Sequence, residues 1–216
     1  MQILSVTGGA PLYGSVSIHG AKNSVLPILA AAVLCQSPCV LHNCPQIEDV
    51  SAALEILEYL GCRTERQGGS IFVDARQMTA CDIPPELAGR MRSSIVFLGA
   101  LAARMGQARI ALPGGCPLGA RPIDLHLAAR RAMGAEIAAD GESVHCRAEK
   151  LHGVHIRLPF PSVGATENIL LAATRCGGCM TVENAAMEPE ITDLIGFLRS
   201  AGANIAGAGT PRLTVY

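Results

Sequence analysis

Cys116 lies in a glycine-rich loop that also carries a cation. The loop spans Leu112–Pro122 and reads LPGGCPLGARP, with Arg121 inside it and His126 shortly after it. Neighbouring cations lower the pKa of a thiol and raise its thiolate fraction, so such a cysteine can act as a nucleophile or a proton donor. A surface turn shaped only by its glycines is the alternative. We favour a functional Cys116, because a flexible turn, a thiol and cations coincide there.

Three further segments lead into apolar helices and could bind an anion at the helix start. They are His19–Ser24 with Lys22, Gly89–Ser94 with Arg92, and Phe160–Asn168 with Ser162. Backbone N–H groups and the helix dipole attract negative charge at such a position, and a cationic side chain reinforces the effect. If the three helix starts converge, they would suit a multiply anionic ligand.

Each of these residues also has a purely structural interpretation. Lys22 can be a solvated cation beside an N-cap formed by Asn23, and Ser162 can be a plain N-cap of its own helix. The structural and functional interpretations of Arg92 are evenly balanced. His126 can be a helix-surface residue or part of a site.

The three helix starts hold the same place in a unit that the chain uses three times. In each unit an Ala-rich helix leads to a short strand, a turn with proline, a second helix and a two-stranded ribbon. The second helices start near Asp49, Asp124 and Asp193 and end at Gly61, Gly134 and Gly202, with roughly 70 residues from one glycine to the next. Acids in a first turn complement the helix dipole, and glycine provides the left-handed residue past a helix end.

One unit therefore reads β-α-β-α-β-β, which predicts an α/β (α+β) fold with helices covering sheets. Three equivalent units suggest pseudo-threefold symmetry, and a linear stack of units is the alternative. The expected units span about 21–76, 83–150 and 151–216, with Ala-rich helices at Asn23–Leu34, Arg90–Met105 and Ala165–Arg175.

Composition and charge argue against several classes of protein. The chain has 216 residues, with 17 Lys+Arg, 18 Asp+Glu and a formal net charge of −1, so no nucleic-acid partner is expected. The longest apolar stretch, Val25–Cys35, is too short to span a bilayer and contains a proline, so no membrane span is expected. No export signal is visible, which indicates a cytoplasmic protein.

The nine cysteines fit a reducing compartment, because their number is odd and most lie in apolar runs. Cys176 and Cys179 form one C-x-x-C pair, but the second ligand pair that zinc would need is not evident. The sequence therefore predicts no metal site. The remaining histidines receive no role, because none has the i, i+4 spacing of a helical metal site.

Several of these segments resemble one known enzyme family. They read GAKNSVLPILAAAVL (20–34), GRMRSSIVFLGAL (89–101), LPGGCPLGARPIDLHL (112–127), PSVGATENILLAAT (161–174) and ENAAMEPEI (183–191). Together they resemble the UDP-N-acetylglucosamine enolpyruvyltransferases, bacterial enzymes of the first committed step of peptidoglycan synthesis. The shikimate-pathway enolpyruvyltransferases share the repeat but lack the cysteine loop, so they are the poorer match.

The resemblance implies transfer of the enolpyruvyl group of phosphoenolpyruvate to the 3-hydroxyl of UDP-N-acetylglucosamine, without a metal or other cofactor. It implies that Cys116 is the general acid, forms a covalent adduct with phosphoenolpyruvate and is alkylated by fosfomycin. By the same resemblance, Lys22, Arg92 and Arg121 hold phosphoenolpyruvate. His126 is a neighbour of the cysteine loop that does not itself touch substrate.

The resemblance also implies a set of residues that bind the UDP-sugar. Asn23 contacts the sugar near the reacting hydroxyl, and the uridine and diphosphate are lined by Arg121, Pro122, Ile123, Asp124, Leu125, Ser162, Val163 and Gly164. One local departure from the family pattern is Met187, which stands where many relatives have arginine, so a local ion pair is in doubt.

The main departure from the family is length. Family members are about twice as long and consist of two similar domains of three units each, which together form an inside-out α/β barrel with the active site between them. The resemblance implies that residues 21–216 form the domain with the cysteine loop, and that residues 1–20 belong to the other domain. Possible partners are therefore that second domain or a self-associating inter-domain face.

Three hypotheses about function follow from the sequence. The first is the cysteine-bearing half of the transferase, with negligible activity alone, because groups from the other side of the site are missing. The second is a non-catalytic module that binds a UDP-sugar or phosphoenolpyruvate. A structural or interaction protein built on the repeat is the third and the least favoured.

Overall fold

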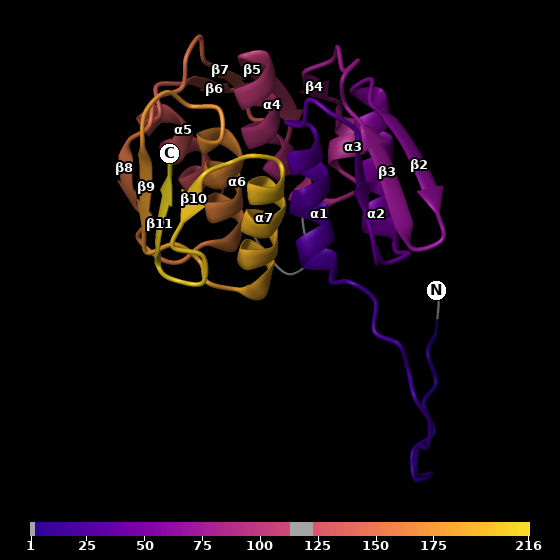
Figure 1. Cartoon of the computed structure of the whole chain (residues 1–216). Helices are drawn as coiled ribbons and strands as arrows, with labels where there is room; N and C mark the ends of the chain where they lie inside the picture. Colours follow the sequence, from indigo (N-terminus) through magenta and orange to yellow (C-terminus); the bar gives the residue numbers. More distant parts are fainter. Residues whose placement is uncertain (1–2, 113–122) are drawn as a thin grey trace.

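The computed structural model describes residues 3–112 and 123–216. Three antiparallel ribbons form the outside of the body, and helices fill its inside (Figure 1). Each ribbon belongs to one of the three expected units. The predicted α/β fold with a threefold repeat is confirmed.

The three sheets follow one plan. The first has the order β1 (Cys39–Leu41), β3 (Ser70–Asp74), β2 (Arg63–Gln67). The second has the order β4 (Asp82–Ile83), β5 (Gln107–Ala111), β7 (Ser143–Arg147), β6 (Glu136–Ala139). The third has the order β8 (His155–Arg157), β9 (Met180–Glu183), β11 (Arg212–Val215), β10 (Ile205–Ala206). All neighbours pair antiparallel except β4 with β5 and β8 with β9, which are parallel.

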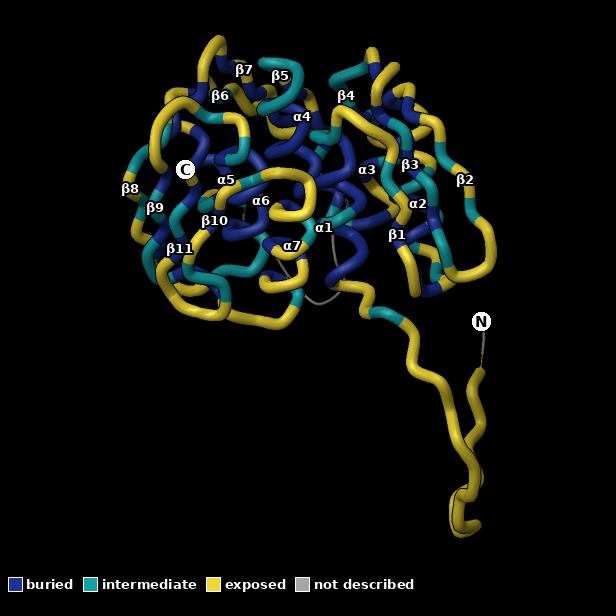
Figure 2. Tube along the Cα trace, viewed as in Figure 1, coloured by how far each residue is buried: buried dark blue, intermediate teal, exposed yellow. Residues whose placement is uncertain are grey.

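The helices alternate between a central and an outer position. The central helices are α1 (Lys22–Ala32), α4 (Phe97–Met105) and α6 (Val163–Ala173), and the outer ones are α2 (Glu48–Tyr59), α5 (Asp124–Ala132) and α7 (Pro189–Ser200). Two short helical turns, α3 (Pro85–Ala88) and η1 (Arg92–Val96), precede α4. Figure 2 shows α1, α4 and α6 as the buried centre of the molecule. These helices are built from alanine and leucine, and small side chains let them pack closely.

The second Ala-rich helix begins later than the sequence predicts. Instead of one helix over Arg90–Met105, the chain forms the 3₁₀ turn η1 and then α4. Met91 is extended at φ −142°, and the Ser94 hydroxyl donates a hydrogen bond to the Ala88 carbonyl at 3.1 Å. This serine bonds to backbone outside the helix and thereby competes with a regular α-helical start.

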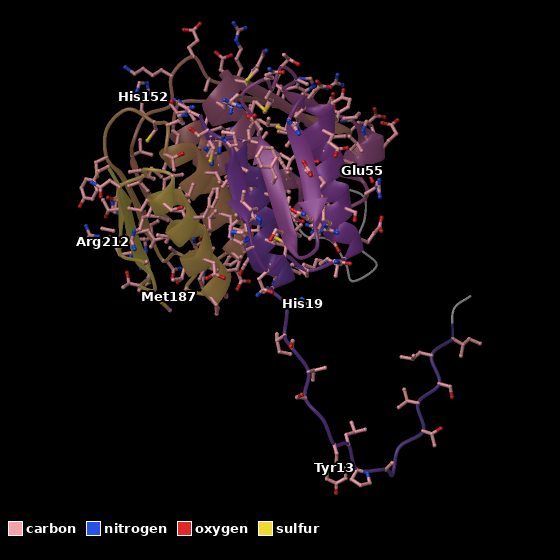
Figure 3. All side chains as sticks on the ribbon, turned by 45° about the vertical axis from the view of Figure 1, so that its right-hand side comes forward. Tyr13, His19, Glu55, His152, Met187 and Arg212 are labelled. Carbon is pink, nitrogen blue, oxygen red and sulfur yellow. The ribbon has the colours of Figure 1, made fainter. Side chains whose placement is uncertain are left out.

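The first unit lacks the opening strand that the repeat predicts. The second and third units open with β4 and β8, whereas the described residues before α1 form no strand. The Gly20 N–H donates to the Asn43 carbonyl at 3.0 Å, past the end of β1, and the chain before Gly20 leads away from the body. Figure 3 shows Tyr13 on this extended N-terminal segment, far from the body.

The close contact between α4 and α6 gives a testable prediction for stability. A Cβ atom at Gly99 would lie 2.6 Å from the Asn168 carbonyl oxygen, whereas a Cβ at Gly196 in α7 would meet nothing within 4 Å. We expect Gly99→Ala to lower the free energy of unfolding by about 1–3 kcal/mol, because the two helices must separate. Gly196→Ala is the matched control and should raise it by up to about 1 kcal/mol through helix propensity. Urea unfolding measures both, and equal stabilities would contradict this packing.

Candidate functional site

The starts of the three Ala-rich helices converge on one cavity of about 500 Å³. The start of α1, the turn η1 and the start of α6 line it, together with residues of α2, α5 and α7. The lining residues that the sequence had singled out are Lys22, Asn23, Arg92, Ile123, His126, Ser162, Val163 and Gly164. The cavity therefore combines two cationic side chains with helix N-termini, an arrangement that suits a ligand with several negative charges.

Some of the predicted site residues do not line this cavity. Asp124 is exposed at the first turn of α5, and the half-buried Leu125 packs against the core. The helical period explains the difference, since Ile123 and His126 are three positions apart and share the face of α5 that meets the cavity. Cys116, Arg121 and Pro122 lie outside the described residues.

Three acids of the outer helices also hold the first turn of α1. The Lys22 ammonium lies 2.7 Å from a carboxylate oxygen of Asp49 in α2. The Asn23 side chain donates to Glu190 at 3.3 Å, and the Ser24 hydroxyl donates to Asp193 at 2.6 Å, both in α7. Units one and three therefore fix α1 from both sides. Asp49 and Glu190 also line the cavity.

His126 is buried, so its interpretation as a helix-surface residue is wrong. Its ring nitrogen Nδ1 accepts a hydrogen bond of 2.9 Å from the side-chain amide of Asn168, which also donates to the Ile95 carbonyl at 2.9 Å. Burial lowers the pKa of His126 to about 4, and the nearby cation Arg130 adds to the shift. The imidazole is therefore neutral at pH 7, with its remaining proton on Nε2.

The Arg130 guanidinium is fully buried near His126 and Asn168. It donates to the backbone carbonyl of Asn168 and, at 3.4 Å, to the Met133 sulfur. Burial lowers its pKa to about 10, which leaves it charged at neutral pH. Together with Asn168 and His126 it connects α5 to α6, so the two helices that supply one wall of the cavity are held by polar contacts in the core.

Sequence reasoning missed Glu167, which lies in α6 at the wall of the cavity. The residue is 6% exposed, and its carboxyl group forms no hydrogen bond or ion pair with another residue in 3–112 or 123–216. Burial raises its pKa to about 8, and the neighbouring Glu190 adds to the rise. One signal could have found it, because Glu167 is the single carboxylate in the mostly apolar helix Val163–Ala173.

The described residues were also searched for a metal site. Within the described ranges, no group of three or more Cys, His, Asp or Glu side chains could hold a metal ion. Met187 is exposed and lies at the surface of the body (Figure 3). No helix among the described residues is long and apolar enough to cross a membrane.

Comparison with known proteins decides the family. The sequence model of EPSP synthase (3-phosphoshikimate 1-carboxyvinyltransferase) matches residues 6–216. The chain belongs to the EPSP synthase family. Over most of its length it is a domain of this family, whose members are carboxyvinyl (enolpyruvyl) transferases.

Relatives with similar sequences carry a more specific name. The chain is 50% identical over 210 residues to UDP-N-acetylglucosamine 1-carboxyvinyltransferase 2 of Caldanaerobacter subterraneus subsp. tengcongensis, covering 97% of this chain and 50% of the relative. It is 46% identical over 214 residues to UDP-N-acetylglucosamine 1-carboxyvinyltransferase of Oleidesulfovibrio alaskensis, covering 97% and 50%. The chain thus spans about half the length of the curated relatives it matches.

Solved structures confirm the fold. The enolpyruvyl transferase NikO from Streptomyces tendae matches with a TM-score of 0.84 at 28% identity, covering 96% of this chain and 49% of NikO. EPSP synthase from Acinetobacter baumannii matches with a TM-score of 0.71 at 18% identity, covering 94% and 46%, which shows the fold alone. This chain therefore corresponds to one domain of their two-domain fold.

Proposed function

We propose that this chain is the cysteine-bearing half of a UDP-N-acetylglucosamine 1-carboxyvinyltransferase. The observation that carries the proposal is the cavity in which Lys22, Arg92 and the N-terminus of α6 converge. Its charges suit phosphoenolpyruvate and the diphosphate of a UDP-sugar. Relatives of the same name at 44–50% identity support the assignment. The reaction would make a peptidoglycan precursor in the bacterial cytoplasm, as a step toward cell-wall growth and division.

In the proposed reaction this chain's residues hold the substrates and move a proton. Lys22, Arg92 and Arg121 would bind the carboxylate and phosphate of phosphoenolpyruvate, and the start of α6 at Ser162 would bind the diphosphate. Cys116 would protonate the methylene carbon C3 while the sugar 3-hydroxyl adds to C2 and gives its proton to a base of the site, which yields a tetrahedral ketal. Transfer of a C3 proton back to the Cys116 thiolate would then break the bond from C2 to the phosphate oxygen, release inorganic phosphate and leave the enolpyruvyl ether. No metal or redox cofactor takes part in this scheme.

The buried neighbours of the cavity would position these groups. His126 is neutral, so it would act as a hydrogen-bond partner and not as a cation toward the anionic substrates. Asn23 is held by Glu190, which would orient its amide toward the sugar. Ile123, Val163 and Gly164 would provide the apolar lining beside the nucleotide, while Asp124, Leu125 and Pro122 are proposed from the sequence resemblance alone.

A non-catalytic module that binds a UDP-sugar or phosphoenolpyruvate is the second candidate function. The observation that favours it is the cavity itself, which lies within this one domain and could hold these ligands whether or not turnover follows. Such a module would bind the same ligands in the same cavity but would not release phosphate.

Labelling by fosfomycin tests the assignment of Cys116. We expect this epoxide to alkylate Cys116 slowly and in preference to the other eight cysteines, because the cation Arg121 in the same sequence segment would favour a thiolate there. Peptide mass mapping identifies the labelled residue, and Cys116→Ser is the control that should take up no label. Selective labelling of another cysteine would contradict the assignment.

A further inference from the structure

We propose that Cys35 and Cys39 form a redox-active dithiol, which a peroxide oxidises to a disulfide within the chain. The pair lies in the connection from α1 to β1, at the opposite end of α1 from the candidate site. The proposal concerns modification of this connection, so it goes beyond the proposed function and depends neither on turnover nor on Cys116.

The first observation is the short loop that holds the two thiols. It reads CQSPC, and both of its ends are fixed to regular structure. The Cys35 N–H donates to the Ala32 carbonyl at 3.1 Å, at the end of α1. Cys39 opens β1 and pairs with Val73 of β3. Pro38 restricts the backbone between them, so the two cysteines are kept near each other.

The second observation is the contact between the two side chains. The Cys39 thiol donates a hydrogen bond to the Cys35 sulfur. The Ala31 carbonyl oxygen lies 4.0 Å from the Cys35 sulfur, and the Val73 carbonyl oxygen lies 3.7 Å from the Cys39 sulfur. Two sulfurs within hydrogen-bond reach are close enough for side-chain rotation to join them in a disulfide.

The third observation is the charge around the pair, which makes Cys35 the nucleophile. The hydrogen bond from Cys39 lowers the pKa of Cys35 to about 7 against the effect of burial, and the cation Arg104 adds to the decrease. Arg104 also donates to the Cys35 carbonyl at 3.1 Å, which fixes this end of the loop to α4. By contrast, burial raises the pKa of the nearby Cys62 thiol to about 11. The thiolate therefore forms at Cys35.

The fourth observation is a route for the oxidant. Cys35 and Cys39 line a hollow of about 580 Å³ between the end of α1 and the end of α7. Both are half-buried, whereas Cys44, Cys62 and Cys146 are buried. A small peroxide can thus reach the Cys35 sulfur without opening the core.

A metal site is the less suitable interpretation of this pair. In the part of the chain that the structure describes, no third ligand joins two cysteines in a group that could hold a metal ion. Stable sites for zinc have three or four protein ligands. A dithiol without further ligands favours disulfide chemistry.

The other closely spaced pair, Cys176 and Cys179, differs from this one in its surroundings. The Cys176 thiol donates to the Ala173 carbonyl at 3.1 Å, and burial raises its pKa. Cys179 is exposed. This pair is therefore accessible but poorly activated, which makes it a comparison within the same molecule.

The proposed oxidation has two steps. The Cys35 thiolate attacks one oxygen of hydrogen peroxide, the O–O bond breaks, and the leaving hydroxide takes up the proton that Cys35 has lost. The sulfur of Cys39 then attacks the sulfenic acid on Cys35, the S–O bond breaks, and hydroxide leaves with the Cys39 proton as a second water. Two thiols are oxidised and one peroxide is reduced to two waters. A small dithiol such as dithiothreitol would reverse the reaction by thiol–disulfide exchange.

Treatment of the unmodified chain with hydrogen peroxide, followed by alkylation of the remaining thiols, tests the proposal. Trypsin releases both cysteines in one peptide, Asn23–Arg63, which also holds Cys44 and Cys62. We expect tandem mass spectrometry to show the loss of two hydrogens between Cys35 and Cys39, with the alkylating label on the other two. This disulfide should form at least about tenfold faster than one between Cys176 and Cys179, because only Cys35 has a lowered pKa.

The same measurement in concentrated urea separates the fold from the local sequence. There the two pairs should oxidise at similar rates, because Arg104 and the hydrogen bond no longer act on Cys35. A preference that persists in urea would contradict the proposed role of the folded loop. Equal rates for the two pairs in the folded chain, or a disulfide between Cys39 and Cys62, would also overturn the proposal.

Single replacements assign the role of each thiol. Cys39→Ser should leave a sulfenic acid on Cys35 that dimedone traps, because the second thiol is missing. Cys35→Ser should leave Cys39 in its thiol form. Cys81→Ser is the matched control, since Cys81 is also half-buried but lines a different hollow, and it should leave the rate of disulfide formation unchanged. Sulfenic acid on Cys39 in the Cys35→Ser chain would show that the nucleophile is wrongly assigned.

Discussion

Replacement of Glu167 by glutamine is expected to stabilise the chain at pH 8.5 and to change its stability little at pH 4. Glutamine has nearly the same shape as glutamic acid and stays neutral at every pH in this range. The carboxyl is buried in the wall of the cavity beside Glu190, and its pKa is raised from 4.5 to about 8. The charged form is therefore the costly one in the folded chain.

The direction of the pH dependence follows from this shift. Between pH 4.5 and 8 the folded state keeps the Glu167 proton while the unfolded state has lost it, so the stability from this group falls as the pH rises. Below pH 4.5 both states are protonated, and the variant gains nothing. Each unit of pKa difference corresponds to about 1.4 kcal/mol, so the gain for Glu167→Gln at pH 8.5 should exceed about 2 kcal/mol.

Urea unfolding at several pH values measures this effect. Glu149→Gln is the matched control, because Glu149 is exposed and lies outside the cavity. The control should follow the unmodified chain throughout. A gain from Glu167→Gln that is the same at pH 4 and at pH 8.5 would show that folding does not shift the pKa of Glu167 and would contradict its burial in the cavity wall.

Much of the fold could be predicted because the repeat uses residue types with strong local preferences, glycine after a helix end and aspartate near a helix start. The closing residues Gly61, Gly134 and Gly202 all have positive φ, and Asp49, Asp124 and Asp193 all lie in or near the first turn of their helices. Such signals act within a few residues, so they survive in any tertiary context. The expected convergence of Lys22, Arg92 and Ser162 followed from the equivalence of the three units.

Other features depend on contacts between distant residues and left no local signal. The hydrogen bond from Ser94 to Ala88 lies just before the late start of α4, and the described residues before α1 form no strand beside β1. A histidine on a helix says nothing by itself about burial, so the role of His126 with Asn168 could not be predicted. Glu167 carried a signal, the single acid in a mostly apolar helix, that sequence reasoning did not use.

The largest expected effect concerns turnover by the two halves together. Residues of this chain are proposed to hold phosphoenolpyruvate and to protonate it, and the remaining groups of the site would then lie in the half that the chain does not span. Positioned reacting groups and general acid–base groups each contribute several powers of ten to a rate. The present chain alone should therefore release no phosphate above the uncatalysed background.

Phosphate release from phosphoenolpyruvate in the presence of UDP-N-acetylglucosamine is the most direct measurement. It should be made with this chain alone and with this chain co-expressed with the remaining half of the Caldanaerobacter enzyme. We predict turnover only for the pair, and a loss of at least about 100-fold when Cys116 is replaced by alanine. Phosphate release by this chain alone, or a pair that keeps full activity with Cys116→Ala, would contradict the account of this chain as the cysteine-bearing half of the enzyme.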